Sequence, residues 1–343
     1  MKARNNQVGR LKAEIRALNA KLYDAMLECR IGEATVKVAC TQLGTDPATL
    51  KSRSWLEIAR EAIGDNRDRV QRAVCRKLGK SRQAYRQGHH ARMRRQVDQG
   101  AIIAEVFKVR AELPSTGGRK LHAAIMPTLV EKGVSCGRDR LFDILRDADL
   151  LVKRRKPSFP HTTKFDPSLG VSPNLVKDML VDRPNVVLVA DVTYLHVGGG
   201  FRYLALIMDK GSRDIVGWHL GYHCDANCCI EALKMAVRYL PKGIRVIHHS
   251  DRGNTYACHA YRDYLDALGW TQSMTEVLHC YENSVAERLN GILKQEFYLD
   301  QVFANEEIAL KAVREAVRLY NTRRLHESLG YVTPHEFRRR NAA

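Results

Sequence analysis

Apolar positions near the start of the chain follow the spacing of a coiled coil. They recur at alternating steps of three and four residues, with charged residues between them: Val8, Leu11, Ile15, Leu18, Leu22, Ala25 and Cys29. This repeat predicts a helix whose apolar seam pairs with a second helix, and we interpret residues 1–50 as a coiled-coil oligomerisation segment. The alternative is a helix that packs its apolar face on its own domain.

Residues 51–92 have the pattern of a helix, a turn and a second helix. Val74 and Leu78 would be buried, Gly79 would form the turn, and Ser81 would cap the second helix. The outward side of that helix would carry Arg82, Gln83 and Arg86. Arginine and glutamine on such a helix suit base edges and phosphates, so we expect a DNA-binding helix-turn-helix here.

Residues 93–152 predict a second helical DNA-binding domain of the same kind. Its turn would lie at Gly133 and its N-cap at Ser135, with apolar residues on one face of the helix that follows. The apolar face comprises Leu141, Ile144 and Leu145, and the outward side carries Arg138 and Arg140. A plain helical hairpin is the alternative for each unit, but two units in tandem favour DNA binding.

A basic, proline-bearing linker is predicted over residues 153–180. It opens with Lys153, Arg154, Arg155 and Lys156. We expect these four cations to contact DNA phosphates, with a merely solvated tether as the alternative.

The pattern changes from helical to mixed after residue 181. The run "NVVLVAD" (185–191) predicts a strand that is buried on both faces. The elements expected after it are strands at 201–209 and 214–220, a helix at 225–240, a strand at 244–247, a helix at 256–268, a strand at 270–274 and a helix at 282–298. Residues 181–300 should therefore form a mixed five-stranded α/β sheet, and residues 301–343 a helical extension.

Charge narrows the class of partner. The 343 residues include 56 lysines and arginines against 38 aspartates and glutamates, a formal net charge of +18, which favours a nucleic acid as partner. No apolar stretch is long enough to span a bilayer, and the N-terminus lacks the apolar core of a signal peptide. The nine cysteines are scattered, which is typical of reduced thiols. We expect a cytoplasmic protein without a membrane partner.

Two aspartates stand at the predicted ends of strands. Asp191 ends the first strand, and Asp251 follows the fourth in "HSDRGNTY". Side chains at the carboxyl ends of neighbouring parallel strands converge, and two buried carboxylates repel each other unless a cation lies between them. Hard cations such as Mg²⁺ take oxygen ligands. Taken singly, each aspartate is better explained as a strand-end turn residue.

The long helix after the second aspartate offers a third carboxylate. At about 100° per residue, Asn283 and Lys294 share the face of Glu287, whereas Glu296 points to the opposite side and Glu282 to the flank. Glu287 is therefore the candidate, although a solvated helix face fits the same charges.

Four ordered motifs resemble those of a known family. Asp191, Asp251 and Glu287, the last two with 35 residues between them, resemble the DDE triad of retroviral-type integrases and bacterial transposases. The motifs are "RPNVVLVADVTYL", "HSDRGNTY", "YENSVAERLNGILKQE" and "YNTRRLHESLGYVTPHEF". In this order and spacing they are similar to the bacterial insertion-sequence-three family of transposases.

The resemblance implies a fold, a chemistry and a set of partners. It implies an RNase H-like core for residues 181–300, in which Asp191, Asp251 and Glu287 hold two Mg²⁺ ions about 3.5–4 Å apart, with Mn²⁺ able to substitute. The substrates would be double-stranded DNA, namely the terminal inverted repeats of an insertion sequence and its target. The reaction would be cleavage and strand transfer by a homodimer or higher oligomer. We also expect DNA contacts from Arg252, Asn283, Lys294, Arg323 and Arg324.

Two other functions are compatible with parts of this pattern. One is a catalytically silent DNA-binding repressor, and the other is an RNase H-like nuclease that only hydrolyses. A metal-dependent nicking assay separates the repressor from an enzyme. The predicted coiled coil and tandem DNA-binding units favour joining of paired ends over simple hydrolysis.

Overall fold

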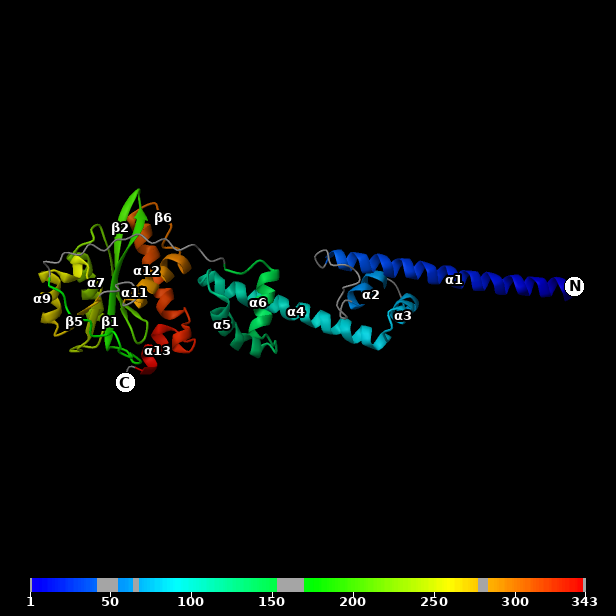
Figure 1. Ribbon diagram of the computed structural model, residues 1–343, viewed down its shortest axis with the longest axis horizontal. Coiled ribbons are helices and arrows are strands. Elements are labelled where there is room, and N and C mark those ends of the chain that lie inside the picture. The colour runs from blue at the N-terminus through cyan, green and yellow to red at the C-terminus, as the bar shows by residue number, and fades with distance from the viewer. Residues whose placement is uncertain (1, 42–54, 64–67, 153–169, 277–282, 342–343) are drawn as a thin grey trace. The chain divides into compact units, whose positions relative to one another are not determined.

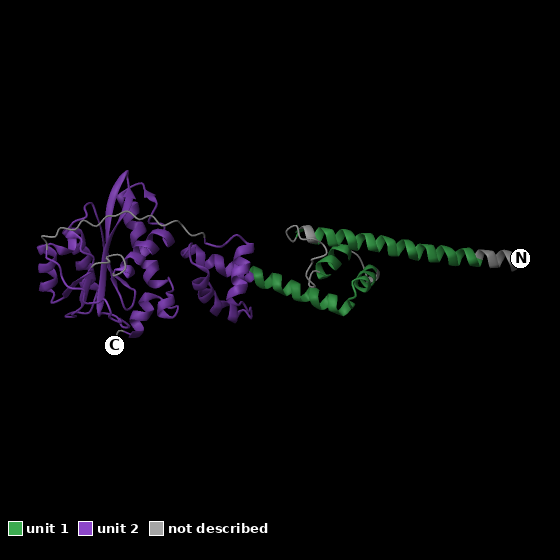
Figure 2. Cartoon of the chain, in the orientation of Figure 1, with its two compact units in different colours: residues 1–100 green, residues 101–343 purple. Residues whose placement is uncertain are grey.

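The chain forms two compact units. The computed structural model describes residues 2–41, 55–63, 68–152, 170–276 and 283–341. Residues 1–100 make up the first unit and residues 101–343 the second (Figures 1 and 2). Among the described helices, none combines the length and the apolar character that crossing a bilayer requires. The finer division into six segments expected from the sequence stays a prediction.

The first unit is helical and is built on one long helix. Its elements are α1 (Lys2–Thr41), α2 (Trp55–Ile63), α3 (Asp68–Lys77) and the first part of α4 (Arg82–Glu112). A small core joins the C-terminal half of α1 to α2 and α3 through Leu27, Ala34, Val38, Ile58, Ala59, Ala62, Ile63 and Val74. The C-terminal half of α1 thus packs on its own unit, which was the alternative to a coiled coil.

The N-terminal half of α1 keeps its apolar stripe in solvent. Leu11, Ile15, Leu18 and Leu22 are between 52% and 60% exposed in the single chain. These are the central positions of the predicted heptad seam. One chain of this protein therefore leaves the seam uncovered, and its pairing with a second helix stays a prediction.

The turn between α3 and α4 follows the sequence prediction closely. Gly79 has φ +65°, a backbone conformation that residues with a Cβ rarely adopt. Ser81 Oγ accepts a hydrogen bond from the Ala84 N–H at 3.0 Å, as an N-cap does. Val74 is fully buried and Leu78 packs against the same core.

The second unit begins with a helical layer. The rest of α4 packs with α5 (Gly118–Glu131) and α6 (Arg138–Asp147) around a core that includes Leu141 and Leu145. The predicted cap was wrong: α6 starts at Arg138 with Gly137 at its N-cap position and no side-chain cap. Ser135 lies too far before the first turn to reach its free N–H groups.

A mixed sheet forms the centre of the second unit. Its strands are β1 (Val187–Val197), β2 (Gly200–Asp209), β3 (Ile215–Gly221), β4 (Ile247–Ser250) and β5 (Thr271–Met274), in the order β3-β2-β1-β4-β5. β1, β2 and β3 are antiparallel neighbours, whereas β4 and β5 run parallel to β1. The predicted mixed five-stranded sheet is confirmed, and the fold is RNase H-like. A further short strand, β6 (Val302–Phe303), pairs with the end of β1.

Two strand boundaries differ from the prediction. β1 runs six residues past Asp191, because its pairing with β2 continues as far as Val197 and Gly200. Asp191 therefore lies in the middle of the strand and not at its end. β4 begins at Ile247, where the prediction had ended it, so Asp251 follows the strand directly.

Helices cover both faces of the sheet. On one face, α7 (Ala226–Tyr239), α8 (Asn254–Ala257) and α9 (His259–Ala267) share a core with Leu188 and Ala190. On the other, α11 (Ser284–Glu296) and α12 (Glu306–Thr322) share a core with Val187, Val189, Leu195 and Val197. Alternate residues of a strand point to opposite faces. Asp191 has the parity of Val187 and Val189, so it points toward α11.

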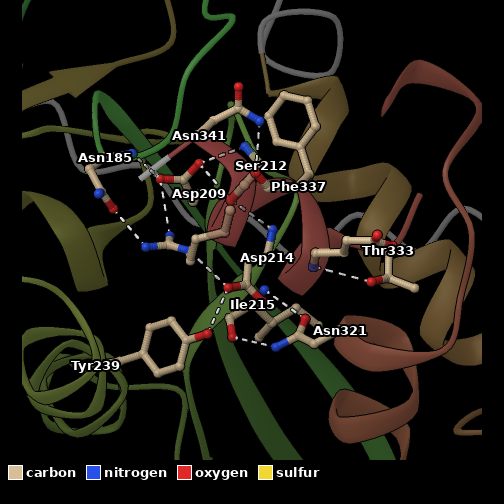
Figure 3. A network of polar contacts seen from close by, with 12 residues as sticks. Asn185, Asp209, Ser212, Asp214, Ile215, Tyr239, Asn321, Thr333, Phe337 and Asn341 are labelled. Atoms are coloured by element: carbon tan, nitrogen blue, oxygen red, sulfur yellow. Dashed lines mark hydrogen bonds and ion pairs between the residues drawn. The ribbon is translucent and has the colours of Figure 1, made fainter. Parts of the chain in front are cut away.

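The C-terminal segment closes on the sheet through buried charges. It continues from α12 through a 3-10 turn, Glu327–Leu329, to α13 (Pro334–Asn341). Arg338 on α13 places Nε 2.9 Å from Asp214 Oδ2 and Nη2 3.3 Å from Asp209 Oδ2, and both carboxylates are fully buried (Figure 3). Its Nη1 donates to Asn185 Oδ1 at 2.7 Å, and the Tyr239 hydroxyl donates to Asp214 Oδ2 at 2.8 Å. This network anchors α13 at the turn between β2 and β3.

Candidate active site

Asp191 and Asp251 lie side by side on neighbouring strands. β1 and β4 are parallel, and their register pairs Val189 with His249. Two residues farther along each strand are Asp191 and Asp251. The first is held because the Val192 N–H donates to its Oδ1 at 2.9 Å, and the second because the Gly253 N–H donates to its Oδ1 at 3.0 Å. The sheet therefore brings the two predicted carboxylates together.

Gly253 leaves room for the side chain of Asp251. A Cβ built on it would lie 3.0 Å from Asp251 Oδ1, closer than ordinary van der Waals contact allows. The two histidines before Asp251 are buried and have structural partners. His248 hydrogen-bonds the Tyr261 hydroxyl at 3.0 Å, and His249 Nδ1 lies 2.9 Å from Ser273 Oγ. The carboxylate, and not an imidazole, is thus the polar group available at the end of this strand.

Helix α11 brings the third carboxylate to β1. Asn283, its N-cap residue, donates from Nδ2 to the Ala190 carbonyl at 3.1 Å. About two turns later, Asn290 donates from Nδ2 to Asp191 Oδ2 at 2.8 Å. Glu287 lies between these two contacts on the same helix face, and its side chain is exposed. The face predicted from helical spacing is therefore the face that lies along β1.

The three carboxylates influence one another electrostatically. The pKa of Asp191 is raised to about 8, first by burial and then by Asp251, with a smaller contribution from Glu287. The pKa of Glu287 is raised too, by burial and then by Asp251. Lys294 opposes the shift at Asp191. Asp191 and Glu287 thus both feel the charge of Asp251, and the three side chains form a site rich in carboxylate oxygens.

Such a site suits a hard divalent cation. Within the residues that the structure describes, no three acidic, histidine or cysteine side chains already stand close enough together to coordinate one ion. The donor set nevertheless fits: it consists of carboxylate oxygens, and a cation would offset the burial and the repulsion that raise the pKa values of Asp191 and Glu287. An ionised carboxylate has about four lone-pair sites. Asp191 therefore keeps acceptor capacity beyond its bonds from Val192 and Asn290.

Two other glutamates were considered for the third carboxylate of the site, Glu296 and Glu282. Glu296 points away from β1, as predicted, and pairs with Arg324 at 2.8 Å and Lys120 at 3.1 Å. Glu282 lies outside the described residues. Sequence reasoning missed Asn290, although it stands three positions after Glu287 and so shares the predicted polar face.

Two of the residues expected to contact DNA are corrected by the structure. Asn283 is 3% exposed, because its amide binds the backbone of β1. Arg324 is 4% exposed, because both Nε and Nη2 donate to the Glu296 carboxylate at 2.8 Å. These two buried side chains hold neighbouring elements of the fold together, so they are not available at the surface for a contact with DNA.

The other described residues that were expected to contact DNA are at least partly exposed to solvent. Lys294 is half-buried, with Nζ 4.1 Å from the centre of the Tyr194 ring. Arg252 donates to the Thr275 carbonyl at 2.5 Å, and Arg323 pairs with Glu112 at 3.2 Å. The partly or fully exposed residues of the helical units are Arg82, Gln83, Arg86, Arg138 and Arg140. The four cations of the predicted linker, Lys153, Arg154, Arg155 and Lys156, lie outside the described residues.

Comparison with known proteins finds similar families and relatives for most of the second unit. The family described as "Integrase core domain" matches residues 181–280, and a second profile of that description matches residues 268–334. The insertion element IS600 uncharacterized 31 kDa protein of Shigella sonnei is 33% identical over 270 residues, 77% of this chain and 97% of that protein. The transposase for insertion sequence element IS904 of Lactococcus lactis subsp. lactis (strain IL1403) is 27% identical over 255 residues, 74% of this chain and 100% of that protein.

Further similarities extend to a third transposase and to a solved structure. Transposase InsF for insertion sequence IS3A of Escherichia coli (strain K12) is 32% identical over 188 residues, 52% of this chain and 65% of that protein. The HTLV-2 integrase catalytic core domain in complex with magnesium (trimeric form) covers 46% of this chain and 97% of its own at 17% identity, with a TM-score of 0.37. Three observations agree: one relative matches over nearly its whole length, the integrase core matches, and the four motifs occur in order. The chain belongs to the insertion-sequence-three family of bacterial DDE transposases.

Proposed function

We propose that Asp191, Asp251 and Glu287 are the catalytic carboxylates of this transposase and that together they hold two Mg²⁺ ions. The observation that carries the proposal is geometric: Asp191 and Asp251 occupy matching positions of the parallel pair β1 and β4, and α11 is held against β1 beside them through Asn283 and Asn290. Burying like charges at one place is unfavourable unless the site has a use for them. When bound, the ions would polarise the scissile phosphate and lower the pKa of the attacking water or 3′-hydroxyl.

The neighbours of the carboxylates fix where their oxygens point. The Val192 N–H and the Asn290 amide bind one oxygen each of Asp191, and the Gly253 N–H binds Asp251. Such contacts limit side-chain torsions, so the oxygens are oriented before DNA arrives. Lys294, half-buried and close to Asp191, would bind a phosphate next to the one that is cut.

The substrate is double-stranded DNA from the ends of an insertion sequence, together with its target. The net charge of +18 supports this proposal, as do the two basic helical units. Arg82, Gln83 and Arg86 follow a well-formed turn and are at least partly exposed, which suits terminal-repeat recognition. Residues 51–92 and 93–152 would recognise the repeat, and residues 181–300 would cut and join it.

Paired ends require more than one copy of the protein. The exposed stripe on the N-terminal half of α1 supports association through a coiled coil of residues 1–50. Cys29 belongs to the same heptad register and is exposed. A parallel pairing would bring two copies of Cys29 together, so oxidation would join the chains by a disulfide at this position.

The test removes one carboxylate at a time. Asp191→Asn and Asp251→Asn should abolish cleavage and strand transfer of end DNA while they retain binding in a gel-shift assay. Asp225→Asn is the matched control: this exposed residue caps α7 through the Cys228 N–H, which an asparagine also does. Cleavage near the wild-type rate by either active-site variant would disprove the assignment of that residue.

A further inference from the structure

A cavity of 370 Å³ lies on the side of α11 that faces away from Glu287. Its wall includes Arg288 and Ile292, which are about 100° and about 140° around the helix from Glu287. Four more basic side chains line it, from α5, the turn between β2 and β3, and the segment after α12: Lys120, Arg213, Arg324 and His326. All belong to the second unit, so the cavity gathers positive charge away from the three carboxylates.

Two of these basic side chains, Arg324 and Lys120, bind the same carboxylate. Glu296 accepts two hydrogen bonds of 2.8 Å from Arg324, and two of 3.1 and 3.5 Å from Lys120. Arg324 also donates from Nη1 to the His326 ring at 2.9 Å. Burial and then the charge of Arg324 lower the pKa of His326 to about 2, so the imidazole is neutral and adds no charge. One negative charge therefore faces two positive ones in this cluster.

The remaining cations, Arg213 and Arg288, have no hydrogen-bonded or ion-paired carboxylate of this kind; the buried Asp209, which is paired with Arg338, attracts Arg213 only from beyond ion-pair distance. No hydrogen bond or ion pair joins the side chains of Arg213 and Arg288 to any other residue that the structure describes. Glu327 lines the cavity as well, but its carboxylate pairs with Arg119 at 3.1 Å. Burial lowers the pKa of Lys120, and Arg324 and Arg288 lower it further. Like charges thus repel around an open space, which is the electrostatic signature of an anion site.

We infer that this cavity binds a backbone phosphate of duplex DNA, with Arg213 and Arg288 as its guanidinium ligands and Lys120 as a third positive charge. The inference rests on the proposed function for its choice of polymer. Guanidinium groups match phosphate oxygens in two parallel hydrogen bonds, and the hydroxyls of Ser284 and Ser328 also line the cavity. Arg288 is exposed, so a phosphate that remains within its strand can enter.

This site gives the C-terminal motif a function. Tyr320, Arg324, His326 and Ser328 of "YNTRRLHESLGY" all line the cavity. Arg324 and His326 are buried and bonded, so they shape the wall, while the two unpaired arginines receive the ligand. A helix with its side chains is about 10 Å across. The bound phosphate is therefore a different one from the phosphate at the carboxylates, and the two contacts would set how DNA crosses α11.

The test compares two charge-matched double variants of the full chain. Arg213→Gln with Arg288→Gln removes the proposed ligands, and Arg238→Gln with Arg314→Gln removes two exposed arginines from α7 and α12. Duplex DNA affinity is measured against salt without divalent metal, so the result does not depend on whether the carboxylates catalyse. Loss of one phosphate contact should reduce the log–log slope by about 0.9 in the first variant and by much less in the control.

A second arm locates the phosphate. Each backbone phosphate of the duplex is replaced in turn by a neutral methylphosphonate. At one position the replacement should weaken binding to the wild type severalfold and leave the double variant unchanged. Arg213→Lys with Arg288→Lys should keep the salt slope, because lysine also binds phosphate as a point charge. Thermal midpoints of all variants confirm that the second unit is folded.

Two results would overturn the inference. Equal salt slopes in the test and control variants, both folded, would mean that no DNA phosphate enters the cavity. If inorganic phosphate at constant ionic strength raised the thermal midpoint of the wild type and not of the test variant, while the slopes remained equal, the cavity would bind free phosphate instead. A wild type that binds DNA normally but fails to cleave would contradict the proposed function and leave this site intact.

Discussion

Asp191→Asn should stabilise the second unit when no metal is present. The pKa of Asp191 is raised from 3.8 to about 8, so the native carboxyl still holds its proton at pH 7, whereas the unfolded one has lost it. Between these values the native state binds one proton more than the unfolded state. The free energy of unfolding therefore falls by about 1.4 kcal/mol for each pH unit as the pH rises through this window.

The magnitude follows from the same shift. At pH 7 the penalty reaches about 4 kcal/mol at most. Asp191 keeps part of its surface exposed, and solvent relieves part of this penalty, so we expect a gain of about 1–3 kcal/mol from the neutral side chain.

The substitution also preserves the contacts of the carboxyl. An asparagine oxygen still accepts from the Val192 N–H. The amide of Asn290 can rotate to present its oxygen, which is buried without a hydrogen-bond partner among the described residues, to the new NH₂ group.

The assay is urea unfolding followed by tryptophan fluorescence in a Trp55→Phe background. The remaining tryptophans, Trp218 and Trp270, both belong to the second unit, so the signal reports on the core alone. Stability is measured between pH 4 and pH 8.5 in EDTA and again in Mg²⁺. The advantage of Asp191→Asn should grow with pH and vanish near pH 4. Mg²⁺ should stabilise the wild type and not the variant, because a ligand stabilises the state that binds it.

Two outcomes would refute this reasoning. A pH-independent difference between Asp191→Asn and the wild type would mean that the pKa of Asp191 is not raised. Equal stabilisation of both proteins by Mg²⁺ would remove Asp191 from the ligand set. Asp225→Asn, which deletes the same charge at an exposed helix cap, should reproduce neither effect.

Four further variants test other parts of the structure. Arg338→Met leaves two buried carboxylates without their cation and should lower the free energy of unfolding by about 3–5 kcal/mol, measured in the same urea assay. Glu287→Gln should remove joining of a pre-cleaved end without lowering the urea midpoint, whereas Glu296→Gln should lower that midpoint because it breaks a buried ion pair. Leu18→Lys combined with Leu22→Lys should give a smaller species by light scattering, because charges are disfavoured in an apolar seam; an unchanged mass would exclude association through α1.

The sequence predicted the sheet well because its strands are buried on both faces. Continuous apolar runs such as 186–190 mark such strands, and helical spacing placed Glu287 on the side of its helix that lies along β1. The end of β1 was missed for a physical reason. Past Asp191 the strand is paired and only partly buried, so its apolar signal fades while its hydrogen bonding to β2 continues.

Polar residues that bind partners inside the protein were harder to interpret from the sequence. Arg324 and Asn283 looked like DNA contacts, because a charged or polar residue in a motif gives no local sign that its partner is far away in sequence. Arg324 binds Glu296, 28 residues before it, and Asn283 binds a backbone carbonyl 93 residues before it. Only the tertiary structure reveals such partners. The same holds for Arg338, which meets its carboxylates across more than 120 residues.

Helix α11 is fixed at both ends, and this determines how the active site is completed. At its start Asn283 holds the backbone of β1, and at its end Glu296 is bound by Arg324 and Lys120. Between these anchors its apolar face packs into the core through Leu289 and Leu293. A helix held in this way does not shift toward Asp191 without breaking buried contacts at both ends. On the proposed assignment, Glu287 would therefore complete the site by rotation of its own exposed side chain and not by movement of the helix.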